Sequence, residues 1–133
     1  MTSSGETDLS VILKTLKPVL NEGDFVFCTV NDAITINPDE VISFFREKEG
    51  HTIIVRKEWA DERSLSYSFI ASWITLTVHS SLSAVGLTTV FSKALSEKGI
   101  SCNVVAACHH DHIFVDRKDA AEAMRILEGL SGN

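Results

Sequence analysis

Apolar residues recur with the period of an α-helix in four stretches of the chain. In residues 8–17 the spacing i, i+3, i+4, i+7 is carried by Leu9, Ile12, Leu13 and Leu16. A second helix is predicted over residues 37–50, because Asn37 is a good N-cap and Pro38 suits the first helical position. Its apolar stripe would consist of Val41, Phe44 and Phe45. Two further helices are predicted in the second half of the chain, over residues 87–98 and 116–127.

Short runs of β-branched and aromatic residues predict the strands. The predicted strands are residues 25–30, 52–56, 66–78, 100–107 and 112–115. A turn at residues 18–23 would separate the first helix from the first strand. Residues 58–63 are rich in charge and are predicted to form a loop.

The two halves of the chain repeat one plan. Residues 9–48 and 87–127 each run through a helix, a turn, a strand, a short turn, an Asp-containing strand and a capped helix. The second half alone has a leading strand and the first alone has a trailing one, so two incomplete β-α-β-β-α-β units would share or exchange strands. We therefore predict an α+β protein with an antiparallel sheet system and helices on one face. Its lobes would be residues 1–65, the less complete one, and residues 66–133.

Composition and charge narrow the class of protein. The chain has 133 residues, of which 44% are hydrophobic and 23% charged, as is ordinary for a globular protein. The formal net charge of −6 argues against a surface that binds nucleic acid. The longer basic side chains are interleaved with acidic ones instead of clustered: Arg46, Lys48, Arg56 and Lys57 alternate with Glu47, Glu49 and Glu58.

Neither a targeting segment nor a membrane segment is predicted. The first eight residues, MTSSGETD, are polar and lack the apolar core of a signal peptide. The longest apolar stretch, residues 69–78, is shorter than the about 20 residues that span a membrane. The three cysteines are odd in number and irregularly spaced, which indicates reduced thiols. We expect a cytoplasmic protein that contacts neither membrane nor nucleic acid.

Two short motifs flank the helix that is predicted after strand 66–78: Val85-Gly86-Leu87 at its start and Gly99-Ile100-Ser101 after its end. With these motifs, residues 66–130 resemble an ACT domain, a family that has Pro-Gly-Leu and Gly-Ile-Asn at the two places. The whole chain is similar to an uncharacterised bacterial subfamily of compact tandem ACT-like proteins. Residues 80–87 also resemble the tandem ACT-like arginine sensors of eukaryotes and the regulatory domains of aspartate kinases. The resemblance implies a ferredoxin-like fold and regulation by a bound amino acid.

The resemblance also implies a role without catalysis. Since no catalytic domain accompanies the module, we expect no enzyme activity and no cofactor, and a regulated enzyme would be another chain. ACT-like sheets often complete themselves by pairing edges, so we expect a homodimer with the ligand at or near an interface.

The loop at residues 79–87 is the predicted ligand site. A helix N-terminus offers unsatisfied N–H groups that suit a carboxylate, and Gly86 removes a Cβ where a ligand approaches. Ser101 and Asn103 would lie near the same helix start and orient the polar end of the ligand. The predicted contacts are Ser80, Ser81, Leu82, Val85, Gly86, Leu87, Ser101 and Asn103. The alternative is structural: Ser83 is an ordinary cap, and Gly86 merely allows close helix–strand packing.

Two other functions stay open from the sequence. One is a structural or protein-interaction domain without a ligand. The other is a metal-binding protein that uses the cluster His109, His110, Asp111 and His112, with Cys108 beside it. The spacing of that cluster is poor, because His110 and His112 share a face of a strand and His109 points away. A solvated β-turn explains it more simply, and no nucleophile motif accompanies the cysteines.

Overall fold

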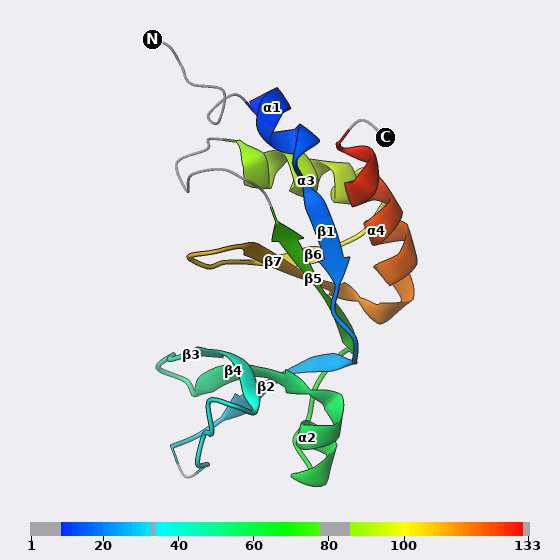
Figure 1. Cartoon of the computed structure of the whole chain (residues 1–133). Coiled ribbons are helices and arrows are strands. Elements are labelled where there is room, and N and C mark those ends of the chain that lie inside the picture. Colours follow the sequence, from blue (N-terminus) through cyan, green and yellow to red (C-terminus); the bar gives the residue numbers. More distant parts are fainter. Residues whose placement is uncertain (1–8, 33, 78–85, 132–133) are drawn as a thin grey trace. The chain divides into compact units, whose positions relative to one another are not determined.

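The computed structural model describes residues 9–32, 34–77 and 86–131 and shows an α+β fold (Figure 1). Every strand pairing with a described register is antiparallel. The elements are, in order, α1 (Leu9–Lys14), β1 (Lys17–Leu20), β2 (Phe25–Val30), β3 (Val41–Phe45), β4 (His51–Arg56), α2 (Lys57–Glu62), β5 (Ala71–Thr77), α3 (Leu87–Ser96), β6 (Cys102–Ala106), β7 (Asp111–Asp116), the 3₁₀ turn η2 (Arg117–Asp119) and α4 (Ala120–Gly129).

Contacts divide the chain into two compact units. The first unit comprises residues 1–21 and 73–133, and the second comprises residues 22–72. The second unit is therefore an insertion in the sequence of the first.

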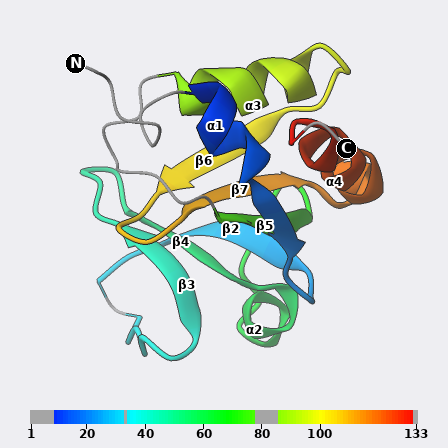
Figure 2. The ribbon, with the colours of Figure 1, turned by 45° about the horizontal axis from the view of Figure 1, so that its top comes forward.

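The sheet of the first unit has strand β5 between β1 and β7, with β6 beyond β7. Strand β1 pairs with β5 from Lys17↔Thr77 to Leu20↔Ile74. Helices α3 and α4 pack against each other (Figure 2). Their apolar stripes join one face of the sheet in a buried core of Ile12, Leu16, Ile74, Leu76, Leu87, Phe91, Leu95, Ile100, Ile113, Val115, Ala123 and Leu127. The prediction of helices on one face is confirmed here by the packing of both helices.

The second unit is a smaller sheet in the order β3, β4, β2. Strands β2 and β4 pair along their whole length, from Phe25↔Arg56 to Val30↔His51. Helix α2 contributes two buried side chains to a core of Val26, Cys28, Val30, Ile53, Val55, Trp59 and Ala60. We call this set the second core.

The predicted helix over residues 37–50 is wrong. Residues 38–40 form a turn, in which the Asn37 side-chain oxygen accepts from the backbone N–H of Asp39 at 3.0 Å. Residues 41–45 form strand β3, which pairs with β4 through a register shift between Val41 and Ser43. The sequence VISFF is rich in β-branched and aromatic residues, which favour a strand. Its hydrogen bonds with strand β4 then stabilise the strand over the predicted helix.

Three smaller expectations are also corrected. Residues 18–20, the start of the predicted turn 18–23, belong instead to strand β1, because β5 offers a partner even for a segment that contains Pro18. The predicted charged loop 58–63 is mostly helix α2, whose residues Trp59 and Ala60 are buried. The predicted strand 66–78 begins only at Ala71 within the described residues.

Candidate functional site

The predicted ligand loop is described only at its end. Ser80, Ser81, Leu82 and Val85 lie outside the described residues. Gly86 stands at the N-cap of α3 with a φ of +90° and a ψ of −5°. This left-handed conformation favours glycine, because a Cβ there would crowd the backbone. Gly86 has no side chain to accept from the N–H groups of the first turn, and its own carbonyl accepts from Val90 at 3.0 Å.

Leu87 anchors the helix in the core. Its side chain is buried and packs in the core of the first unit with Phe91 and Leu95 from the same face of α3. The backbone of Leu87 therefore stands at the loop, whereas its side chain points into the protein.

The structure does not bring Ser101 and Asn103 to Gly86 within one chain. Ser101 follows the end of α3, and this helix of 10 residues is about 15 Å long. Asn103 is exposed, and its neighbours Cys102 and Val104 pack against the core on the helix side of β6. Because side chains alternate along a strand, Asn103 faces the opposite side of the sheet.

The histidine cluster forms a polar network around His112. Its Nδ1 accepts from the indole N–H of Trp73 at 3.0 Å, and the Thr75 hydroxyl lies 3.1 Å from the same nitrogen. Burial lowers the pKa of His112, and the nearby charge of His110 lowers it further. The rings of His110 and His112 meet edge to face at 6.2 Å, so the two share a face of the hairpin, whereas His109 is exposed.

These histidines do not gather metal ligands. Across residues 9–32, 34–77 and 86–131, no three His, Cys, Asp or Glu side chains come together in a way that could hold a metal ion. His112 is engaged with Trp73 through one of its two nitrogens.

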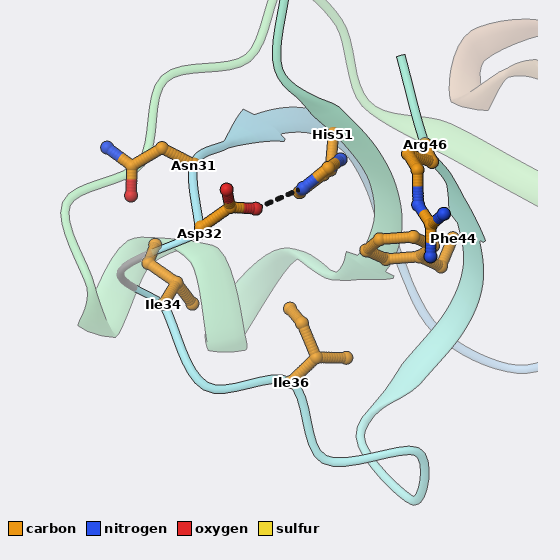
Figure 3. Close-up of a pocket in the computed structure, with 7 residues that line it drawn as sticks. All are labelled: Asn31, Asp32, Ile34, Ile36, Phe44, Arg46 and His51. Carbon is orange, nitrogen blue, oxygen red and sulfur yellow. Dashed lines mark hydrogen bonds and ion pairs between the residues drawn. The ribbon is translucent and has the colours of Figure 1, made fainter. Parts of the chain in front are cut away.

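A groove of about 500 Å³ lies in the second unit (Figure 3). The loop after β2 forms one wall, and strands β3 and β4 supply the other. Its lining residues are Asn31, Asp32, Ile34, Ile36, Phe44, Arg46 and His51. The sequence alone does not reveal this site, because residues 37–50, which include Phe44 and Arg46, are predicted as a helix and because Asp32 and His51 are far apart in the sequence. Only the pairing of β2 with β4 brings those two residues together.

A polar contact closes one end of the groove. The Nε2 of His51 lies 2.5 Å from a carboxylate oxygen of Asp32, as Figure 3 shows. The Nδ1 of the same ring is buried and has no hydrogen-bond partner among the described groups. The ring of Phe44 lies 5.0 Å from that of His51. Arg46 makes no ion pair with any residue that the structure describes.

Comparison with protein families identifies the two halves. ACT-domain models match residues 4–72 and residues 68–129. The chain therefore belongs to the ACT-domain family and consists of two ACT lobes of ferredoxin-like fold in tandem. The predicted family and fold class are confirmed. Membership of this family supports a regulatory, ligand-binding module.

Solved structures agree with this assignment. A protein of unknown function from Vibrio cholerae, described as a possible transport protein, is 44% identical, with a TM-score of 0.84 over 96% of this chain and 99% of that chain. A protein from Agrobacterium tumefaciens is 16% identical, with a TM-score of 0.66 over 87% and 89% of the two chains. The regulatory subunit of aspartate kinase from Thermus thermophilus is 10% identical, with a TM-score of 0.62 over 85% and 95%, and shows the shared fold.

A search for curated relatives and a search of the described residues for membrane-spanning helices were both negative. No curated protein matches the chain. Among the described residues, no helix combines the length and the apolar character needed to cross a membrane.

Proposed function

We propose that the chain is a regulatory or sensory module that binds an amino acid or a similar small metabolite at the strand-to-helix loop, residues 79–87. The observation that carries this proposal is the left-handed Gly86 at the N-cap of α3. The protein would act in the cytoplasm by transmitting the bound state to another protein, such as an enzyme regulated in trans. The ligand contacts would be Ser80, Ser81, Leu82, Val85, Gly86, Leu87, Ser101 and Asn103.

The chemistry of the helix start supports a carboxylate ligand. The first N–H groups of a helix have no partner within the helix, and the dipole makes that end positive. Gly86 lets a ligand approach the backbone, since no Cβ stands in the way. Leu87, Phe91 and Leu95 hold α3 against the core, so the N–H groups are fixed in direction before a ligand arrives.

Dimer formation would explain how Ser101 and Asn103 could contact a ligand at the loop. Both are exposed, and in one chain the length of α3 separates Ser101 from Gly86. Strand β6 stands at the end of the described strand order, with β7 as its neighbour, so its outer edge is available for pairing. We propose a homodimer in which these two residues approach the ligand loop of the partner subunit.

The test is a thermal-shift screen with each of the twenty amino acids. At least one should raise the melting temperature, because a ligand that binds only the folded state stabilises it. Gly86→Val should remove that response. Gly99→Val is the matched control: Gly99 has a φ of +75°, lies beyond the other end of α3, and has open space around its missing Cβ.

Both substitutions place a β-branched residue in the left-handed region, at a cost of about 1–2 kcal/mol, so a difference in ligand response between them does not come from backbone strain. No response from any amino acid, in protein refolded to remove bound metabolite, would contradict ligand binding and favour an interaction domain. A response that survives Gly86→Val, or that Gly99→Val removes equally, would contradict the placement at the loop.

A further inference from the structure

We propose that the groove in the second unit is a separate binding site for a zwitterionic amino acid with an apolar side chain. The site is independent of the loop at residues 79–87, because every residue that lines it belongs to residues 22–72.

The groove exists because turns occupy the place where a helix is expected. Phe44 pairs with Ile53, so it lies on the face of the sheet that carries the second core. Helix α2 covers part of this face with Trp59 and Ala60. Among residues 31, 32 and 34–40, which the structure describes, none is helical, so no helix from this segment covers the part over β3. An opening is left there, and its volume falls in the range of small-molecule sites, about 300–1,000 Å³.

The apolar part of the groove has two isoleucines that pack against the second core and a phenylalanine that is exposed. Ile34 and Ile36 are half-buried and pack against the second core, which holds the loop in place. Phe44 is exposed over 43% of its surface. Covering an aromatic ring of this kind removes apolar area from water and is favourable. An aliphatic side chain placed between the two isoleucines and Phe44 would gain that free energy.

The charges of the groove match a zwitterion. Arg46 lines the groove and has no ion-pair partner among the described residues, and its planar guanidinium suits a carboxylate. The Asp32 side chain is 94% exposed and engages His51 through one oxygen, which leaves the other for an ammonium group. In Figure 3, Asp32 lies near Ile34 at one side of the groove, and Arg46 lies beside Phe44 at the other. A lone carboxylate would meet Asp32 as a like charge, and a lone amine would leave Arg46 unpaired.

The groove is also organised before a ligand binds. The contact between Asp32 and His51 ties the loop to β4, and the N–H of Ile34 donates to the carbonyl of Asn31 at 3.3 Å. A site that is already formed loses less conformational entropy on binding.

The test is calorimetric titration with L-leucine in the Gly86→Val background, so that the loop site does not contribute heat. Leucine should bind, whereas isocaproate, which lacks the amine, and isoamylamine, which lacks the carboxylate, should each bind about tenfold or more weakly. Equal binding of either analogue overturns the zwitterion assignment. Absence of leucine binding overturns the site.

Variants locate the binding. Arg46→Gln and Asp32→Asn should each weaken leucine binding about tenfold or more. Their matched controls are Lys48→Gln and Glu49→Gln, which make the same charge changes at exposed positions in the turn between β3 and β4. Controls that weaken binding as much as the groove variants overturn the proposal. Because the Gly86→Val background lacks a functional loop site, the result for leucine binding in the groove is independent of the function proposed above.

Discussion

Leu95 and Leu20 give a matched pair of leucines in the first unit. Leu95 lies on the buried face of α3 with no exposed surface, within the core of that unit. Leu20 lies in β1 and is 44% exposed. The change to alanine removes the same atoms at both positions, so a difference in stability beyond the about 1 kcal/mol of helix and strand propensity reports on packing.

The expected cost follows from burial. Replacing a fully buried leucine by alanine loses the transfer free energy of the side chain and leaves a cavity, together about 3–5 kcal/mol. Leu20 is about half covered and leaves no enclosed cavity, so Leu20→Ala should cost about 1 kcal/mol. Leu95→Ala also loosens α3, and therefore the helix start that carries Gly86.

Urea unfolding followed by circular dichroism measures both variants. With a slope of about 1–3 kcal/mol per molar urea, Leu95→Ala should lower the midpoint by about 1–5 M, and Leu20→Ala by about 0.3–1 M. Equal shifts for the two variants, or a larger shift for Leu20→Ala, would refute the placement of the α3 stripe in the core.

Three further predictions concern polar contacts. Burial lowers the pKa of His112 in the folded protein, so the unfolded chain binds more protons, and the free energy of unfolding should decrease as the pH falls below about 6.5. His112→Gln should make the urea midpoint depend less on pH in this range. An unchanged pH dependence would contradict this role of His112. The Asp61 carboxylate raises the pKa of Tyr67, the single tyrosine, so Asp61→Asn should lower the phenolate titration midpoint measured by ultraviolet absorbance. Asp116→Ala should lower the free energy of unfolding by about 1 kcal/mol, because the Asp116 side chain accepts from the N–H of Lys118 and caps η2. Asp119→Ala removes no side-chain cap and should cost less. Equal costs in urea unfolding would argue against the cap at Asp116.

The second half of the chain is the part that sequence reasoning predicts well. Helices α3 and α4 carry a clear apolar stripe, ends marked by Gly99 and Asp116, and about three turns each, so local signals and packing agree. Asp116 is a residue type that often caps a helix start, and the structure shows that it caps η2 before α4 begins.

The first half shows where local signals fail. Asn37 and Pro38 do start a turn, but the following VISFF sequence is decided by the ladder with β4, a contact between distant residues that no local pattern encodes. The groove depends on the same contact, since Asp32 and His51 meet only after β2 and β4 pair.

The ends of the second unit meet at a β-ladder. Leu20 pairs with Ile74, and at the next position the backbone N–H of Asn21 donates to the carbonyl of Trp73 at 2.9 Å. The Asn21 side chain adds bonds to the same carbonyl at 3.2 Å and to the Thr75 hydroxyl at 2.9 Å. Strands β1 and β5 are thus the two arms of a hairpin, and residues 22–72 are an insertion at its tip. Hairpin tips tolerate insertion and deletion well, so residues 22–72 could be replaced by another segment, in evolution or by design, while the fold of the first unit is kept.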